Sequence, residues 1–395
     1  IHLWKARFVY NINYLMDPSK LAQSKRKNFM TSSYDSLGIK RVINANATLT
    51  KLGGSLMPEE VIQAMVEASK TFVDIHQLQQ TVGQRLAELT RNEAAYVSCG
   101  AATGLLLATA ACIEKKSKNA YERFPQWGKI SNEVIVQKMH RNSYDYAILE
   151  AGASIVEIGN QHQTLPDELE NAIRNQTIAV FWFQGAMNQP SELSLDQVIE
   201  ICRPKNIPVI VDAAAQLPPV SNFWNFTHQG ADLAIFSGGK DLSGPQASGL
   251  ILGSKELIDI ISGLGAPHHG IGRPMKVGKE EMMGLLAAVE RYLSLDYEQL
   301  FETYEARVTY WINELDGLKG LRAIRDYPNE AGQPVARTKV VLPESHNKDT
   351  VIQDLLQGEP MISVAPSETE NALLLNPMTV KDGEASIVKE RILEV

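Results

Sequence analysis

Short, wholly apolar strands that alternate with helices are the feature that most limits what this chain can fold into. From residue 94 onward seven such strands occur in turn: "AAYVS", "EVIVQ", "SIVEI", "IAVFWFQ", "IPVIVDA", "LAIFSG" and "GLILG". A strand that is apolar on both faces must be covered on both faces. The pattern therefore predicts a doubly wound α/β fold, in which helices lie on both sides of a mostly parallel sheet.

Segments with apolar residues at helical spacing fill the gaps between these strands. Helices are predicted at residues 101–113, 143–151, 166–174 and 194–203, and two amphipathic helices, "PEEVIQAMVEASKTF" and "LQQTVGQRLAEL", precede the first strand. From about residue 279 the pattern changes to one long helical stretch. Short strands, "TKVVL", "MISVA" and "ALLLN", then surround a helix at 348–356, and "EASIVKERILEV" ends the chain.

The change near residue 279 predicts two domains and an extension. We expect a large domain with an N-terminal arm over residues 30–278, and a helical connector with a smaller C-terminal α+β domain over residues 279–395. Residues 1–29 mix aromatic side chains with the basic cluster Lys25, Arg26 and Lys27. We interpret them as an extension outside the fold. The alternative is a basic arm that binds a partner.

Composition excludes several classes of protein. The formal net charge of −8 over 395 residues gives no general attraction to nucleic acid or to an anionic membrane. The three cysteines are an odd number without CxxC spacing, which argues against a disulfide framework or a zinc site and favours a reducing cytoplasm. No apolar run approaches the ~20 residues of a membrane-spanning helix, and no signal-peptide pattern opens the sequence.

Chemically useful residues stand at the carboxyl ends of the strands, where ligands of α/β sheets collect. Gly100, Ala101 and Ala102 open a helix after "YVSC", and their N–H groups suit a phosphate, although small residues there often serve only close packing. Asp212 follows "IPVIV", where a carboxylate is often only a helix cap. Lys240 follows "LAIFSGG", three residues after Ser237. Unless it is a surface lysine, a buried amine there has a lowered pKa and is suited to act as a nucleophile.

Two further polar residues follow strands. Asn188 stands before Pro190 in an otherwise ordinary loop, and His140 follows "EVIVQ", where a lone histidine is more often structural than catalytic. Taken together, these residues provide a phosphate seat, an acid, an amine, a polar group and an aromatic face. Pyridoxal 5′-phosphate needs all of these, with a lysine for its aldehyde and an aspartate for its ring nitrogen.

Five segments resemble a known family: "RVINANATLTKLGGS", "VDIHQLQQTVGQRLAEL", "VDAAAQLPP", "FSGGKDLSGPQASGLILG" and "GIGRPMKVGKEEMMGLLAAVERY". They are similar to the selenocysteine synthase-like group of fold-type I pyridoxal-phosphate enzymes. This group includes bacterial seryl-tRNA selenium transferases and D-glucosaminate-6-phosphate ammonia-lyases. The similarity covers roughly residues 37–395 and is most specific around Lys240. It does not cover residues 1–29.

The resemblance implies a role for each candidate residue. Lys240 would bond the cofactor and Asp212 would pair with its ring nitrogen. The remaining cofactor contacts would come from the phosphate seat at Gly100, Ala101, Ala102 and Ser237, from His140 stacked on the ring, and from Asn188 at the ring hydroxyl.

The same resemblance implies a homodimer or larger homo-oligomer with active sites shared between subunits. The segment "HHGIGRPMKVGK" would then reach a neighbour's pocket, where Arg273 and His268 would bind substrate. The alternative is a solvated basic loop. His268 and His269 lack a third metal ligand, so we predict no metal site.

The resemblance leaves the reaction open between two enzymes. A lyase would remove water and ammonia from a β-hydroxy amino acid or a phosphorylated amino-sugar acid, such as D-glucosaminate 6-phosphate, and release a 2-keto acid. A transferase would add selenium to seryl-tRNA. The acidic chain has no basic RNA-binding module, so we favour the lyase over the tRNA enzyme. Lys240 is the expected base, and His76 and His268 are candidate acids. A non-catalytic relative that only binds the cofactor is the third alternative.

Overall fold

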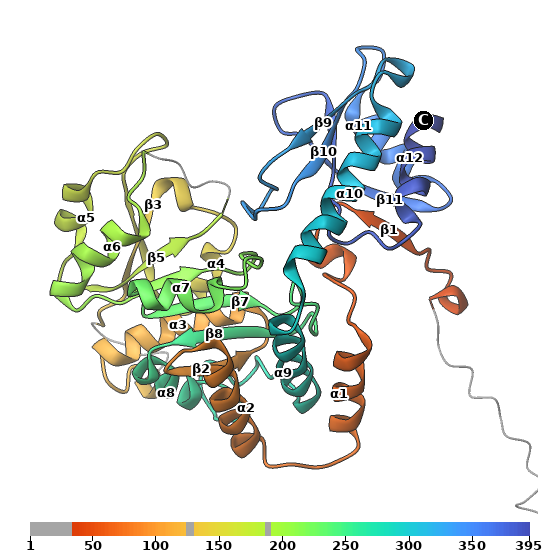
Figure 1. The fold of residues 1–395 in the computed structure, drawn as a ribbon. Coiled ribbons are helices and arrows are strands. Elements are labelled where there is room, and N and C mark those ends of the chain that lie inside the picture. The colour runs from red at the N-terminus through yellow and green to blue at the C-terminus, as the bar shows by residue number, and fades with distance from the viewer. Residues whose placement is uncertain (1–33, 124–129, 186–190) are drawn as a thin grey trace, which may run out of the picture. The chain divides into compact units, whose positions relative to one another are not determined.

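The computed structural model describes residues 34–123, 130–185 and 191–395, and the larger of its two sheets has seven strands (Figure 1). In their order across the sheet, the strands are β2 (Ala94–Ser98), β8 (Gly249–Gly253), β7 (Leu233–Ser237), β6 (Val209–Asp212), β5 (Thr177–Phe183), β3 (Glu133–Gln137) and β4 (Ser154–Ile158). Neighbouring strands from β7 to β4 are parallel, whereas β8 is antiparallel to both β7 and β2. The predicted mostly parallel sheet is confirmed. The connection between β7 and β8 is shorter than the dozen or so residues of a parallel crossover, so β8 turns back.

Both faces of this sheet are buried, which explains why its strands are apolar throughout. Along β7, Leu233 and Ile235 pack in one apolar cluster, whereas Ala234 and Phe236 pack in another on the opposite face. The helices that cover the first face are α3 (Ala101–Lys116), α4 (Asp145–Glu150) and α8 (Lys255–Leu264). Those on the second face are α2 (Ile75–Thr90), α5 (Pro166–Ala172), α6 (Leu195–Cys202), α7 (Asn222–Gln229) and α9 (Lys279–Leu293).

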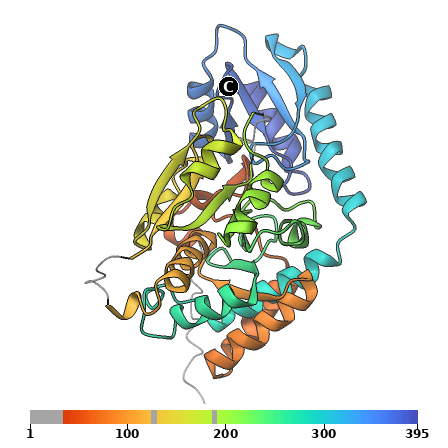
Figure 2. The same ribbon diagram turned by 90° about the vertical axis from the view of Figure 1, so that its left-hand side faces the viewer.

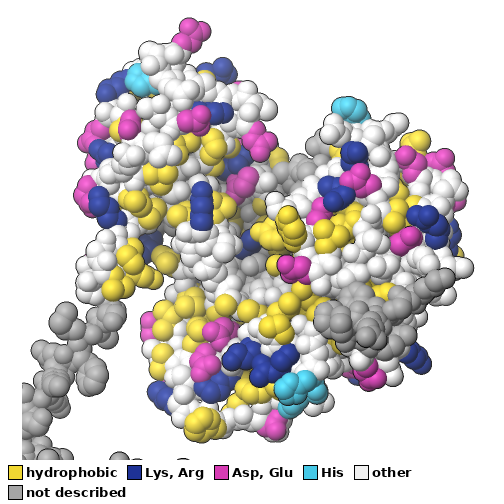
Figure 3. Space-filling model, turned by 180° about the vertical axis from the view of Figure 1, so that it is seen from behind, with side chains coloured by type: hydrophobic (Ala, Val, Ile, Leu, Met, Phe, Trp, Pro, Cys, Tyr) yellow, Lys and Arg dark blue, Asp and Glu magenta, His cyan; other side chains and the backbone are white. Residues whose placement is uncertain are grey.

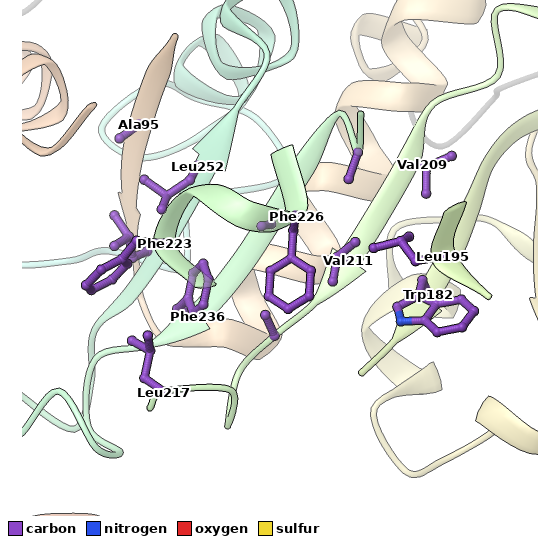
Figure 4. Close-up of a cluster of buried hydrophobic side chains, with 14 of the residues drawn as sticks. Ala95, Trp182, Leu195, Val209, Val211, Leu217, Phe223, Phe226, Phe236 and Leu252 are labelled. Atoms are coloured by element: carbon purple, nitrogen blue, oxygen red, sulfur yellow. The ribbon is translucent and has the colours of Figure 1, made fainter. Parts of the chain in front are cut away.

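Aromatic side chains fill much of the second face. Phe223 and Phe226 reach from α7 onto Phe236 of β7, with ring centroids 5.6 Å and 6.4 Å away (Figure 4). All three rings are buried. Burying one such side chain stabilises a fold by roughly 1.5–3 kcal/mol. The strand that carries the candidate lysine at its end is therefore firmly anchored.

The second sheet has five strands and gathers distant parts of the chain. Across this sheet the strands are β1 (Val42–Ala45), β11 (Met361–Pro366), β12 (Ala372–Leu375), β10 (Arg337–Val341) and β9 (Arg322–Asp326). β1 runs parallel to β11, and the other neighbours are antiparallel. The helices α10 (Tyr297–Leu315), α11 (Lys348–Gln357) and α12 (Glu384–Glu394) share its apolar core. Sequence analysis predicted β10, β11 and β12 but neither β1 nor β9.

Two helices in series link these regions. α9 packs against α1 (Glu59–Ser69) and α2, and α10 packs against β9, β10 and α12 (Figure 2). The predicted long helical stretch is thus two helices with a short turn between them. Residues 42–395 form one compact unit, and residues 34–41 belong to a different one. The domain division at residue 278 stays a proposal, and residues 1–29 lie outside the described part of the chain.

Helix α1 differs from a core helix in one respect. Its apolar residues were expected to mark one buried face, but only Val61 is buried, whereas Ile62 and Val66 are 38% and 41% exposed.

In the described ranges, no helix has both the length and the apolar character needed to cross a membrane.

Candidate active site

The register of the large sheet aligns the candidate residues at one edge. Asp212, the last residue of β6, lies opposite Ile235 of β7. Because residues two apart on a strand point to the same face, Ser237 shares a face and an edge with Asp212. Ser237 lies in turn opposite Gly249 of β8, and Gly249 lies opposite Ser98 of β2. Residues separated widely in sequence therefore meet around one end of the sheet.

Lys240 and Asp212 bring opposite charges to this edge, where Asp212 is buried and Lys240 is half-buried. Burial lowers the pKa of Lys240, while the negative charges of Asp212 and Glu330 oppose that shift. Burial also raises the pKa of Asp212, against the opposing effects of the Ala214 N–H, 2.9 Å from Oδ1, and of the charge on Lys240. The amine is thus held in an environment where its neutral, nucleophilic form is favoured more than in water.

The turn that carries Lys240 is glycine-rich because it is tightly enclosed. A Cβ on Gly238 would lie 2.0 Å from Ser248 Oγ, and one on Gly239 would lie 2.5 Å from Gln246 Cα. The carbonyl of Gly239 accepts hydrogen bonds from the backbone N–H and the hydroxyl of Ser55, at 2.9 Å and 3.0 Å. These contacts fix the backbone from which the lysine side chain extends.

Gly238→Ala should therefore destabilise the protein. The added methyl group would displace Ser248 and contact Leu285 at 2.8 Å, an overpacking that typically costs about 1–3 kcal/mol. Thermal unfolding measures the effect. Gly263→Ala on α8 is the matched control: its Cβ would meet nothing within 4 Å, and alanine is the better helix former by roughly 0.5–1 kcal/mol. Equal melting temperatures for the two variants would contradict this account.

The predicted phosphate seat has the backbone of an anion site. Gly100 caps α3 with φ 84°, a conformation that favours glycine, and the helix begins at Ala101. The Ser98 hydroxyl donates to the Gly100 carbonyl at 2.9 Å. A Cβ on Gly249 would lie 2.5 Å from the Gly100 carbonyl carbon, so this approach requires glycine. The N–H groups of the first turn are free of helix partners, which suits a phosphate.

His140 is fully buried in a 3₁₀ turn, Lys138–His140, directly after β3. Its Nδ1 accepts from the Phe183 backbone N–H at 3.3 Å, and its Nε2 lies 3.1 Å from Glu192 Oε2. The first bond leaves Nδ1 without a proton, so Nε2–H donates to the carboxylate. Its ring meets Trp182 edge-on at 4.6 Å. Glu192 was not predicted, and stacking of His140 on a cofactor stays a proposal.

The remaining candidates that the structure describes are exposed side chains. Asn188 lies outside the described residues. His268 and Arg273 are exposed on the segment after α8, and the His268 ring lies 4.6 Å from that of His76, the other candidate acid. Among the described residues, no hydrogen bond or ion pair joins His76, His268 or Arg273 to Lys240 or Asp212. Nor does this part of the chain contain a cluster of His, Cys, Asp or Glu suited to a metal ion.

Asp241, which was not predicted from the sequence, is half-buried directly after Lys240. The Tyr292 hydroxyl of α9 donates to its Oδ2 at 2.6 Å. Burial raises the pKa of Asp241 to about 7, against the lowering effects of this hydrogen bond and of Arg291. Tyr292 is fully buried. The bond therefore ties the lysine turn to helix α9.

This carboxyl makes stability depend on pH. Its pKa rises from 3.8 to about 7 on folding, so the folded state holds the proton more tightly and the free energy of unfolding falls as pH rises from about 4 to 7. The full effect is at most about 4 kcal/mol. Asp241→Asn keeps an acceptor for Tyr292 and should be stabilised relative to the wild type at pH 8 but much less at pH 4. Urea unfolding at both pH values tests this, and an equal difference at both would contradict it.

The residues present fit pyridoxal 5′-phosphate. An amine and a carboxylate, both desolvated, lie at the same strand edge as a glycine-opened helix terminus. The close approach of Gly249 to the Gly100 backbone leaves no room for a side chain at position 249, and the backbone N–H groups that open α3 suit a phosphate.

Comparison with known proteins supports the same family. The family model described as L-seryl-tRNA selenium transferase matches residues 144–305. A 5′-C-glycyluridine monooxygenase-decarboxylase from a Streptomyces species is 33% identical over 92% of both chains. The D-glucosaminate-6-phosphate ammonia lyase of Salmonella typhimurium is 31% identical over 92% of this chain and 97% of that protein.

Solved structures confirm the fold. A structure of D-glucosaminate-6-phosphate ammonia-lyase superposes with a TM-score of 0.79 at 32% identity, and covers 92% of this chain and 98% of its own. The aspartate aminotransferase of Thermotoga maritima is only 16% identical but shares the fold, with a TM-score of 0.53 over 91% of this chain and 93% of its own. The predicted fold-type I architecture is confirmed.

Proposed function

Because the chain belongs to the selenocysteine synthase-like enzyme family, which includes D-glucosaminate-6-phosphate ammonia lyase, we propose that it is a pyridoxal 5′-phosphate-dependent lyase. Its substrate is a β-hydroxy amino acid or a phosphorylated amino-sugar acid such as D-glucosaminate 6-phosphate. Its products are a 2-keto acid and ammonia, because the water lost with the β-hydroxyl is taken up again in the final hydrolysis. The observation that carries the proposal is the Lys240–Asp212 pair at the sheet edge.

Each group of the cofactor has a partner in this proposal. Lys240 would bond the aldehyde, Asp212 would pair with the ring nitrogen, and the N–H groups after Gly100 would hold the phosphate together with Ser237. His140 would lie against the ring, and Asn188 would bind the ring hydroxyl. When bound, the cofactor supplies an electron-withdrawing ring that stabilises negative charge at the substrate's α-carbon.

The chain's own residues then move protons. With the cofactor bound, Lys240 Nζ would be the general base that takes the α-proton of the substrate. Its lowered pKa favours the neutral amine that this step needs. The β-hydroxyl leaves as water, and hydrolysis then releases ammonia and the keto acid. His268 and His76 remain the candidate acids for the leaving hydroxyl.

We propose a homo-oligomer whose subunits complete one another's sites. His268 and Arg273 do not contact Lys240 within one chain, yet their exposed segment carries the groups that suit an anionic substrate. Several apolar side chains that precede His76 in the sequence are exposed: Phe72 is 100% exposed and Val73 is 47% exposed. Ile62 and Val66 on α1 are also exposed. Such an exposed apolar area indicates a binding surface.

Phe72→Asp should weaken this association, because a charge at a buried apolar contact is costly. Sedimentation should then show a smaller species than the wild type. Phe72→Leu is the matched control and should keep the wild-type size. A monomeric wild-type protein, or a Phe72→Asp variant of unchanged size, would contradict the shared site.

Purified protein loaded with pyridoxal 5′-phosphate should release ammonia and a 2-keto acid from one member of a panel of β-hydroxy amino acids and amino-sugar acids. A glycyl nucleoside with dioxygen belongs in the panel because of the similarity to the monooxygenase-decarboxylase. Release of carbon dioxide from that compound alone would overturn the lyase proposal. A visible absorbance without turnover of any compound would favour a binding protein.

The tRNA alternative has a separate test. Lys and Arg side chains lie interspersed with Asp and Glu on the face in Figure 3, which shows no broad basic area. We therefore expect seryl-tRNA to show no retention with this protein on a native gel. Retention would favour selenium transfer. The three unpaired cysteines support a reducing, cytoplasmic location.

A further inference from the structure

The side-chain amide of Gln216 joins two parts of the chain that lie far apart in the sequence. Gln216 is buried in the turn that follows Asp212. Its Nε2 donates to the carbonyl of Gln184, directly after β5, at 3.0 Å, and to the carbonyl of Ala331, between β9 and β10, at 2.8 Å. A glutamine amide has two N–H donors, and this one meets two acceptors. Gln216 therefore links an end of the large sheet to the second sheet.

Gln184 is bonded in turn to the strand that ends in Asp212. Its backbone N–H donates to the Asp212 carbonyl at 3.0 Å, and the Gln216 backbone N–H donates to the Ala213 carbonyl at 3.0 Å. The carboxylate of Asp212 is held as well, because its Oδ1 accepts from the Ala214 N–H at 2.9 Å. A continuous path of hydrogen bonds thus runs from the Gln216 amide to the backbone and side chain of Asp212.

The segment 327–336, here called the docked segment, is held against the same turn by a second glutamine. The Gln333 side-chain amide donates to the Leu217 carbonyl. Asn329 braces the segment: its Oδ1 accepts from the N–H groups of Ala331 and Gln333 at 3.1 Å and 2.9 Å, and its Nδ2 donates to Gln333 Oε1 at 2.6 Å. Asn329 and Gln333 are both buried. The carbonyl of Ala331 is therefore fixed in place.

We propose that Gln216 is a positioning residue for Asp212, and that it makes the position of this carboxylate depend on the docked segment. The inference rests on the proposed function, in which Asp212 pairs with the ring nitrogen of the cofactor. Loss of the Gln216 amide leaves the Gln184 and Ala331 carbonyls without this donor, so the turn after Asp212 gains freedom to move. A misplacement of about 1 Å in a site can cost about 100-fold in rate. The second sheet thereby contributes to the site through Asp212.

Hydrogen exchange in the protein after removal of the cofactor tests this link. Gln216→Met keeps the length and approximate volume of the side chain and removes both donors. The loss of two hydrogen bonds should make the peptide over residues 212–217 exchange roughly 5- to 30-fold faster than in the wild type. The peptide over residues 327–336 should also exchange faster, because both ends of the link are released. Mass spectrometry of the two peptides measures the change.

Gln79→Met is the matched control. Gln79 is also buried, and its amide donates to a backbone carbonyl, that of Val97 on β2, at 2.9 Å. Two strands separate β2 from β6, so this change should lower the stability of the protein without loosening the turn after Asp212. Equal exchange of the 212–217 peptide in Gln216→Met and Gln79→Met would overturn the inference.

Gln333→Met gives a second test in which the Gln216 side chain stays intact. It breaks the other bond between the docked segment and the turn, so the peptides over residues 212–217 and 327–336 should both exchange faster than in the wild type. Unchanged exchange of the 212–217 peptide in this variant would show that the docked segment does not act on the turn, and would contradict the proposed dependence.

The ring nitrogen of the cofactor gives a readout that a purely structural role of Gln216 would not change. Proteins are loaded with pyridoxal 5′-phosphate that carries an NMR-active nitrogen isotope in its ring, and the resonance reports whether this nitrogen is protonated. It should shift toward the unprotonated value in Gln216→Met but not in Gln79→Met. An unshifted resonance in Gln216→Met, even with faster exchange, would also overturn the inference. Failure of the wild-type protein to bond the cofactor would instead refute the proposed function, and the exchange results would stand.

Discussion

Lys240→Ala should abolish both the covalent attachment of pyridoxal 5′-phosphate and catalysis. No other amine is described at this strand edge, and the loss of a general base alone costs roughly 10²–10⁴-fold in rate. The fold should remain, because the lysine ends a turn whose shape is set by Gly238 and Gly239, and removal of a half-buried amine relieves desolvation. Borohydride reduction of the loaded protein, followed by mass spectrometry, measures the attachment.

Lys255→Ala is the matched control for this experiment. Lys255 begins α8 and pairs with Asp259 on the surface, so its loss should change neither labelling nor turnover. Stable labelling of the Lys240→Ala protein would show that another residue bonds the cofactor. In that case the whole site would have to be placed elsewhere.

Asp212→Asn should keep the cofactor but lose most activity. The amide oxygen can still accept the Ala214 N–H, which now binds Oδ1 at 2.9 Å. The negative charge that would keep the ring nitrogen protonated is lost. A hydrogen bond to a charged group contributes about 1.5–3 kcal/mol, so kcat should fall by about 10- to 100-fold. The same change should lower the pKa of Lys240, because Asp212 raises it.

Asp232→Asn is the control that separates charge from burial. Asp232 is also a desolvated aspartate with a raised pKa, and it accepts a backbone N–H from Val209 at 2.8 Å. It lies just before β7, at the opposite end of the strands from Asp212. We expect altered stability without a specific loss of kcat. Wild-type turnover by Asp212→Asn would refute the pairing with the ring nitrogen.

The local sequence was sufficient to predict the large sheet, because the strands of this sheet are apolar on both faces, as residues 233–236 show. It was also sufficient to place Asp212, Ser237 and Lys240 at one edge, because the ends of parallel strands meet there. The direction of β8 could have been predicted from its short connection to β7. The exposure of Ile62 and Val66 on α1 could not have been predicted, because apolar spacing does not distinguish a face buried in the core from an exposed one.

The partners of the site residues were decided by contacts between distant segments. Glu192 reaches His140 from beyond β5, and Gln333 from the segment between β9 and β10 donates to the Leu217 carbonyl. Asp241 finds Tyr292 on a helix that begins far along the chain. An acidic residue in a loop has the same local pattern whether it is solvated or buried. Its role depends on which donors surround it.

The order of residues along the chain determined the sheet, its functional edge, and the amine and carboxylate placed there, because side-chain periodicity and strand ends are local properties. Only the tertiary structure decided which charges act on that amine and how firmly each is held. Those depend on burial and on hydrogen bonds between segments that the sequence keeps far apart.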